Sequence, residues 1–204
     1  MSLPTLVIGT KNLSSWSLRP WLLLKHLGMA FEEIVLPLDT PEFYRRIVDF
    51  SPAGRVPVWI DNDLKIWDSL AICEYASELA NGKGWPHDVR ERAWARAIGA
   101  EMHSGFQALR SNWPMNALGR DLNVQATPQT LNDIARIDAL WYQCRTAFAD
   151  RGAWLFGEYS IADAMYAPVV LRFQSYNAKL SSVAKQYVAT TLGDRYLQQW
   201  IAEA

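Results

Sequence analysis

Hydrophobic and polar positions in the first eighty residues alternate between two spacings. Short β-branched or apolar runs predict four strands, at residues 5–9, 32–36, 56–60 and 64–67. Between these runs, apolar residues recur every three or four positions and predict three helices, over residues 15–27, 40–50 and 68–80. Asp61-Asn62-Asp63 joins the last two strands as a hairpin, and the first two strands need a parallel crossover. We therefore expect a mixed four-stranded sheet, in the order βαβαββα, with helices packed on it.

The second part of the chain follows a different pattern. The stretch NGKGWPHD, residues 81–88, is rich in Gly and Pro and is typical of a linker between domains. Beyond it no strand pattern appears, and the apolar spacing predicts about five helices: one long helix over 87–113, one over 128–150, one that starts at 160, and two shorter ones. The predicted fold class is α/β plus all-α, with a sheet domain over 1–81 and an all-helical domain over 88–204.

Composition narrows the possible functions. Half of the 204 residues are hydrophobic and the net charge is −1, which is ordinary for a soluble protein and argues against nucleic acid or a membrane as partner. No apolar run approaches the roughly 20 residues of a membrane span, and residues 1–4 lack the basic start of a secretory signal. Two distant cysteines, Cys73 and Cys144, and three scattered histidines predict neither a disulfide nor a metal site. We expect a cytoplasmic protein.

Three hydroxyls gather between the first strand and the first helix. Ser14, Ser15 and Ser17 lie in the stretch NLSSWSLRPW, where the carboxyl end of a strand meets the N-terminus of a helix. Ligand crevices of α/β sheets form at that edge, and a helix N-terminus favours an anion. A serine hydroxyl there can donate a hydrogen bond to a thiolate or a carboxylate. The alternative interpretation is that these serines only begin the helix, as N-cap residues commonly do.

Two further stretches favour a ligand of a particular kind. In GRVP, Val56 precedes Pro57, the usual context of a cis bond, and a cis bond would turn the polar groups of Val56 toward a peptide backbone. Asp68 and Ser69 begin a helix, where they fit the ammonium and carboxylate of an α-amino acid, and Arg55 supplies a cation for a second carboxylate. Together these residues fit a peptide with a zwitterionic head and a carboxylate tail.

The sequence resembles the cytosolic glutathione transferase superfamily. The resemblance rests on SSWSLR, PAGRVPVW, DSLAICEYA and YSIADAMYAPVV, which with the domain order cover nearly the whole chain. The hydroxyl five positions before Arg19 is similar to the serine of the zeta, phi and tau classes, and zeta enzymes carry a comparable SSCS run. Trp16 stands where zeta enzymes have a cysteine, a departure that argues against the zeta isomerase and also against the cysteine-type classes.

The resemblance implies a thioredoxin-like first domain, a homodimer, and glutathione as cosubstrate without a metal. It assigns the catalytic hydroxyl to Ser14, with Ser15 as helper. The glutathione-binding residues that it implies are Val56 for the cysteinyl backbone, Asp68 and Ser69 for the γ-glutamyl head, Arg55 for the glycyl carboxylate, and Arg19 beside the helix N-terminus. Asp163, three residues after Ser160 in a capping-box spacing, is expected to be structural.

The expected reaction is attack of the glutathione thiolate on a small hydrophobic electrophile, as in detoxification. The electrophile pocket is expected to involve the long helix of the second domain, and its candidate residues are Trp16, Met102, His103, Phe106 and Arg110. Two alternatives remain open at this point. One is a glutathione-dependent cis-trans isomerase of the maleylacetoacetate type, and the other is a non-catalytic binding module with the same fold.

Overall fold

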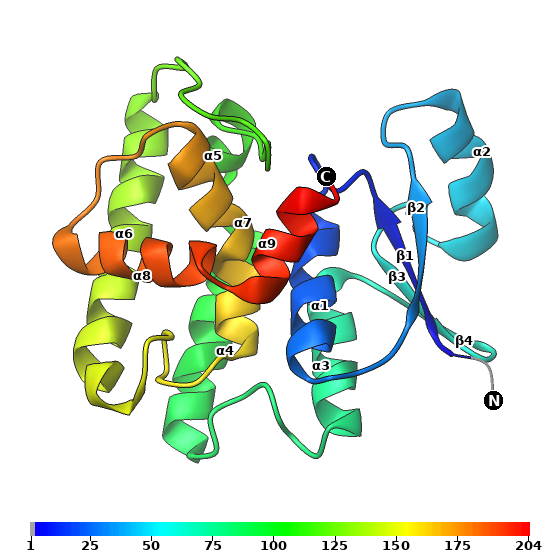
Figure 1. Ribbon diagram of the computed structural model, residues 1–204, viewed down its shortest axis with the longest axis horizontal. Helices are drawn as coiled ribbons and strands as arrows, with labels where there is room; N and C mark the ends of the chain where they lie inside the picture. Colours follow the sequence, from blue (N-terminus) through cyan, green and yellow to red (C-terminus); the bar gives the residue numbers. More distant parts are fainter. Residues whose placement is uncertain (1–2) are drawn as a thin grey trace.

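The computed structural model describes residues 3–204, and its N-terminal half is built on one four-stranded sheet (Figure 1). The strands are β1 (Thr5–Gly9), β2 (Glu32–Leu36), β3 (Val58–Asp61) and β4 (Leu64–Trp67). They lie in the order β2-β1-β3-β4, with β1 parallel to β2 and antiparallel to β3. Because β3 and β4 form the antiparallel hairpin, the predicted mixed sheet is confirmed.

Helices cover both faces of this sheet. They are α1 (Ser15–His26), α2 (Pro41–Phe50) and α3 (Ser69–Leu79). Side chains along a strand point alternately to opposite faces. Leu6 and Ile8 of β1 therefore join the core that contains α1 and α3, whereas Val7 packs with Phe43 and Ile47 of α2. Figure 1 shows α2 on the opposite side of the sheet from α1 and α3.

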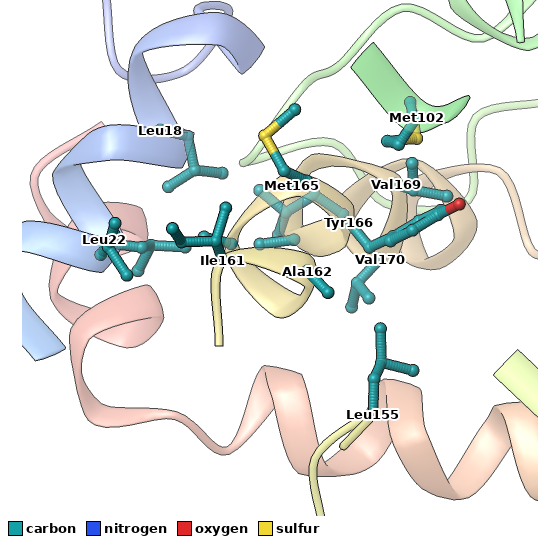
Figure 2. Packing of buried hydrophobic residues seen from close by; sticks show 14 of the residues in the cluster. Leu18, Leu22, Met102, Leu155, Ile161, Ala162, Met165, Tyr166, Val169 and Val170 are labelled. Atoms are coloured by element: carbon teal, nitrogen blue, oxygen red, sulfur yellow. The ribbon is translucent and has the colours of Figure 1, made fainter. Parts of the chain in front are cut away.

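The C-terminal half of the described chain is helical. Its elements are α4 (Val89–Ser104), α5 (Gln107–Asn112), α6 (Pro128–Phe148), the short 3-10 turn η1 (Ala149–Arg151), α7 (Ile161–Ser175), α8 (Ser182–Leu192) and α9 (Arg195–Ala202). α7 runs through the centre, and nearly all of its side chains are buried. Figure 2 shows Leu18 and Leu22 of α1 packed toward Ile161 and Met165 of α7, so one apolar core joins the two halves.

The prediction of a single helix over 87–113 is wrong. α4 ends at Ser104, and Phe106 has a left-handed backbone, with φ of 60°, before α5 begins. A side chain at Gly105 would bring its Cβ within 2.8 Å of the Glu101 carbonyl oxygen, so only glycine fits this bend. Arg110 bridges the break, because its Nε donates to the Gly105 carbonyl at 2.9 Å and its Nη2 to that of Met102.

The predicted capping box at the start of α7 is confirmed. One carboxylate oxygen of Asp163 accepts hydrogen bonds from the backbone N–H and the hydroxyl of Ser160, both at 2.9 Å. The other accepts from the Leu155 N–H and the Tyr187 hydroxyl, both at 3.0 Å. Asp163 is fully buried, and these four donors tie α7 to the preceding segment and to α8.

Residues 3–204 lack two kinds of feature that would point to other functions. None of the helices there is both long and apolar enough to cross a bilayer. Within the same range, His, Cys, Asp and Glu side chains do not gather in threes as a metal site would require. Cys73 and Cys144 are both buried free thiols.

Candidate functional site

The bend between β1 and α1 holds the serine cluster in a buried position. Ser14 and Ser15 are about 5% and 6% exposed, and Ser17 is not exposed at all. The Ser14 hydroxyl donates to the Ser17 Oγ at 2.7 Å, and the Gly9 N–H donates to the same oxygen at 3.1 Å. Ser14 occupies the N-cap position of α1, but its side chain makes no capping hydrogen bond. Its hydroxyl therefore does not serve the capping role that was the alternative interpretation.

Two distant parts of the chain hold this bend in place. The Trp200 indole N–H of α9 donates to the Lys11 carbonyl at 2.9 Å. The Ala117 N–H donates to the Asn12 carbonyl at 3.0 Å, so the loop between α5 and α6 also contacts the bend. The Lys11 ammonium, almost fully buried, lies 2.7 Å from a carboxylate oxygen of Glu33. Both helical-domain contacts reach the segment that immediately precedes Ser14, so the position of this bend depends on the two halves together.

The segment before β3 has the backbone expected for pairing with a peptide. The Val56–Pro57 bond is cis, the form that would turn the polar groups of Val56 toward a peptide. Val56 is partly buried, and Arg55 is exposed, with its N–H donating to the Ser51 hydroxyl at 3.2 Å. The guanidinium of Arg55 thus extends from an ordered backbone at the surface.

The start of α3 carries the predicted pair of head-group residues. One carboxylate oxygen of Asp68 caps the helix, accepting from the N–H groups of Leu70 at 2.9 Å and Ala71 at 3.2 Å. The other lies 3.1 Å from Nε2 of His103, which α4 contributes from the helical half. Asp68 has a φ of 84°, a conformation that costs a non-glycine residue of order 1–3 kcal/mol. Ser69 is 1% exposed, and its hydroxyl has no hydrogen-bond partner in residues 3–204.

Trp16 lies among three basic side chains at the contact between the halves. The guanidinium carbons of Arg19 and Arg110 are 4.3 and 4.8 Å from the centre of its ring, and the His103 ring meets it edge-on at 5.3 Å. Such cation–π contacts contribute about 0.5–2 kcal/mol each. Trp16 is thus held in place by arginines from α1 and α5.

Arg19 is an unpaired buried cation. Its side chain is fully buried, and none of its three guanidinium nitrogens has a hydrogen-bond partner within the described chain. Burial first, and the charges of Arg110 and Arg172 second, hold the pKa of Arg19 well below its usual value. Burial likewise lowers the pKa of His103, an effect that Asp68 opposes and that Arg19 and Arg110 reinforce. An anion beside this cluster would relieve the unpaired charge of Arg19.

The remaining predicted pocket residues lie deeper. Met102 is fully buried and faces Val169 of α7 in the core, as Figure 2 shows. Phe106, at the bend between α4 and α5, is 8% exposed. Because α4 ends at Ser104, the pocket candidates Phe106 and Arg110 do not continue the helix that carries Met102, as the expected single long helix would require. Their contribution to an electrophile pocket stays a prediction.

A large groove lies elsewhere on the molecule. Its volume is about 1070 Å³, and it is lined by residues at the C-terminal end of α1, such as His26, and of the linker, such as Trp85. The serine bend is at the other end of α1. The groove is therefore separate from the site described above.

Residues 13–79 match the protein family described as glutathione S-transferase, N-terminal domain. The chain is 31% identical over 109 residues to a Caenorhabditis elegans protein named "Probable maleylacetoacetate isomerase" and 25% identical over 138 residues to glutathione S-transferase T1 of Arabidopsis thaliana. These matches cover 53% and 59% of this chain, and 50% and 55% of the relatives. The chain thus spans about half the length of the curated relatives that it matches.

Solved structures resemble the chain over nearly its whole length. A glutathione transferase homologue from Burkholderia gl BGR1, crystallised with bound glutathione, has a TM-score of 0.74 at 22% identity, covering 98% of this chain and 96% of its own. The tau-class glutathione S-transferase of mango, Mangifera indica, has a TM-score of 0.73 at 16% identity, covering 98% and 92%. At such low identities the likeness establishes the fold alone, a thioredoxin-like domain followed by a helical one.

Proposed function

We propose that the chain is a glutathione transferase of the glutathione S-transferase family, and that its Ser14 hydroxyl stabilises the thiolate of bound glutathione. The single observation that carries this proposal is the state of that hydroxyl. It lies at the N-terminus of α1, in a buried bend, and is not used to cap the helix. The thiolate then attacks an electrophilic carbon of a small hydrophobic substrate.

A single hydrogen bond from the Ser14 hydroxyl can supply much of the free energy needed to lower the pKa of the glutathione thiol. A free cysteine thiol titrates near about 8.5, so little is ionised at neutral pH. Lowering that pKa by two units requires about 2.7 kcal/mol of preference for the anion. A hydrogen bond to a charged group contributes about 1.5–3 kcal/mol, and the N-terminus of α1 adds to it. The thiolate is the nucleophile, so no general base is needed.

Glutathione would lie across the carboxyl edge of the sheet. The backbone of Val56 pairs with the cysteinyl residue, and Ser69 offers its unpartnered hydroxyl to the γ-glutamyl carboxylate. Asp68 receives the ammonium on the oxygen that now faces His103. Arg55, exposed at the surface, meets the glycyl carboxylate. In this assignment residues 1–81 form the glutathione-binding domain, and Arg19 supports the anion from beneath.

The helical domain, residues 88–204, would supply the pocket for the electrophile. Trp16 and His103 are partly exposed where the two halves meet, and they form its accessible wall. Arg110 supports the Trp16 ring and joins α4 to α5. Met102 and Phe106, which are buried, would support Trp16 and His103 from the core side.

A second candidate function is glutathione-dependent cis-trans isomerisation of a maleylacetoacetate-type acid. One specific observation favours it, the convergence of positive charge from Arg19 and Arg110 on the Trp16 ring, with Arg172 close enough to lower the pKa of Arg19. A carboxylate substrate would be drawn to these cations. The name of the nematode relative points the same way. Both reactions use the same thiolate, and they differ in whether the added sulfur is later eliminated.

Two assays test the proposal. The protein should bind immobilised glutathione and be eluted by free glutathione, and it should conjugate chlorodinitrobenzene at a rate that Ser14→Ala lowers. Ser182→Ala, an exposed serine of α8, is the matched control and should leave the rate unchanged. Turnover of maleylacetoacetate without conjugation would favour the isomerase. Failure to bind glutathione would refute both activities and leave a non-catalytic module.

Oligomeric state and cellular role follow from the family resemblance. We propose a cytoplasmic homodimer that acts in detoxification. Light scattering on the purified protein should give twice the mass of one 23.2 kDa chain.

A further inference from the structure

Ser17 is the most deeply placed hydroxyl of the serine bend. Its side chain has no exposed surface, and it lies one helical turn after Ser14. Its oxygen accepts two hydrogen bonds, from the Gly9 N–H at 3.1 Å and from the Ser14 hydroxyl at 2.7 Å. Gly9 is the last residue of β1, so the strand N–H fixes the position of the Ser17 oxygen.

The number of protons in this pair limits what Ser14 can do. A hydroxyl has one proton to donate and two positions that accept. In the structure the Ser14 proton points to Ser17, so it is not free for a sulfur atom. The Ser17 oxygen accepts twice, and the described residues include no acceptor for the proton of Ser17 itself. In this orientation the Ser17 proton has no acceptor within residues 3–204, and the Ser14 proton is not directed at a thiol.

We propose that Ser17 is a positioning residue that turns the Ser14 hydroxyl toward the glutathione sulfur. When the sulfur arrives, both O–H bonds rotate and no proton changes its oxygen. Ser17 then donates to Ser14, and Ser14 donates to the sulfur, while the Gly9 N–H continues to donate to Ser17. The inference rests on the function proposed above, and it adds a second hydroxyl to the site.

The reversed chain has two physical advantages. Each hydroxyl now donates one hydrogen bond and accepts one, so the buried proton of Ser17 gains an acceptor. Hydrogen bonds in a row also polarise one another, so the bond from Ser14 to the thiolate is stronger than that of an isolated hydroxyl. The two oxygens are 2.7 Å apart, so a hydrogen bond donated by Ser17 would also hold the Ser14 oxygen in place and preserve the direction of its proton.

The test is the titration of glutathione bound to the intact protein, followed by the ultraviolet absorbance of its thiolate. The variants are Ser17→Ala, Ser17→Cys, Ser17→Thr and Ser14→Ala. Ser17→Cys keeps nearly the volume of serine but offers only a weak S–H donor, so it carries the test if the alanine variant does not fold. Ser17→Thr retains the hydroxyl. Circular dichroism and thermal unfolding report the integrity of each variant.

We expect Ser17→Ala and Ser17→Cys to bind glutathione with nearly unchanged affinity but to raise the titration midpoint of its thiol by about one pH unit. At a pH well below the midpoint, a rise of one pKa unit lowers the thiolate fraction about tenfold, so kcat/KM should fall about tenfold there. At a pH well above the midpoint the thiol is ionised in both proteins, so kcat/KM should change little. Ser17→Thr should restore the wild-type midpoint. A purely structural role would change stability or affinity, and would not move a midpoint that threonine restores.

Three results would overturn the proposal, and they can be told apart. If the folded variant without the hydroxyl titrates at the wild-type pH while Ser14→Ala shifts the midpoint, the hydroxyl chain is wrong and the transferase function stands. If a folded Ser17→Thr shifts as far as Ser17→Ala, the hydroxyl is not what matters. If the wild-type protein neither binds glutathione nor lowers the pKa of its thiol, the proposed function fails and this inference fails with it.

Discussion

His103 and Asp68 join the two halves of the protein at the candidate site, with Nε2 of the imidazole 3.1 Å from a carboxylate oxygen. The other oxygen of Asp68 caps α3, so one carboxylate serves a helix end and a contact between domains at once. In the proposed complex the oxygen that faces His103 is the one that receives the ammonium of glutathione. The protonation of His103 therefore bears directly on how well the head group binds.

The affinity for glutathione should weaken in acid through His103. Its pKa is lowered, mainly by burial, so the ring is neutral at pH 7 and gains a proton only below the ordinary histidine value of about 6.5. The imidazolium then pairs with Asp68 and competes with the ammonium. A coupling of about 1 kcal/mol corresponds to about fivefold in affinity. Calorimetry with S-methylglutathione, which has no thiol to titrate, measures this effect.

His103→Gln is the matched variant, because glutamine can donate to Asp68 but cannot become charged. Its affinity should change little between pH 7 and pH 5, and an unchanged acid weakening in this variant would contradict the role of His103. The folded pKa lies below the unfolded one, so the native state binds fewer protons over that range. His103 therefore contributes stability that is present at neutral pH and is lost as the pH falls through its folded pKa.

The catalytic contributions of Ser14 and Ser15 can be compared through the conjugation rates of their alanine variants. Ser14→Ala removes a donor to a developing thiolate, and loss of one such donor lowers turnover by about 100-fold. Ser15→Ala should have a smaller effect, because Ser15 has no hydrogen bond to Ser17 among the described side chains. Steady-state conjugation rates of both variants provide the measurement. A greater loss in Ser15→Ala would move the catalytic assignment to Ser15.

Most of the fold could be predicted because its local signals agree with its tertiary structure. Thr40 and Pro41 begin α2 as cap and first helical residue, and Asn62 supplies the left-handed residue of the hairpin turn. The break after α4 was missed because apolar spacing continues through it. The sequence signal for this break is Gly105. A Cβ atom at this position would lie only 2.8 Å from the carbonyl oxygen of Glu101, so the bend requires glycine.

The composition of the site could be predicted better than its geometry. The sequence predicts the serine cluster, but only the three-dimensional structure shows that Ser14 bonds Ser17, although a spacing of three residues on a helix suggests such a contact. The burial of Arg19 could not be inferred, because arginine is mostly exposed in proteins. Its position depends on the packing of α1 against α7, which no local pattern specifies.

Replacing Arg19 by an apolar residue should weaken glutathione binding without lowering the stability of the fold. Burial of an unpaired cation is costly, and replacing buried charges by apolar groups of similar volume is often neutral or stabilising by about 1–4 kcal/mol. Arg19→Met forfeits one cation–π contact with Trp16, worth about 0.5–2 kcal/mol, so the unfolding midpoint should stay level or rise. Affinity for glutathione should fall at the same time. Thermal unfolding and calorimetry of the same sample measure both.

Arg136→Met is the control for this substitution. Arg136 is half exposed and paired with Glu101 at 2.7 Å, and such surface ion pairs contribute about 0–1 kcal/mol. Its loss should leave glutathione binding unchanged. A strongly destabilised Arg19→Met with normal binding would show that the guanidinium has a structural partner and not an anionic ligand.

Asp163 should be the most sensitive carboxylate of the helical half. Asp163→Asn replaces an acceptor of four hydrogen bonds by an amide whose NH₂ group faces donors, so we expect a loss of about 2–4 kcal/mol. Asp88→Asn is the control, because Asp88 is an exposed helix cap and asparagine caps equally well. Urea unfolding at pH 7 compares the two variants.

The pH dependence of stability gives a second measure of Asp163. Burial raises its pKa to about 6, against about 3.9 in the unfolded chain, so the native state holds this proton more tightly. Its contribution to stability is therefore largest in acid and is lost as the pH rises from about 4 to about 6, by at most about 3 kcal/mol. Asp163→Asn cannot titrate and should lack this part of the slope. An identical slope in wild type and variant would mean that the four donors outweigh burial and keep Asp163 ionised throughout.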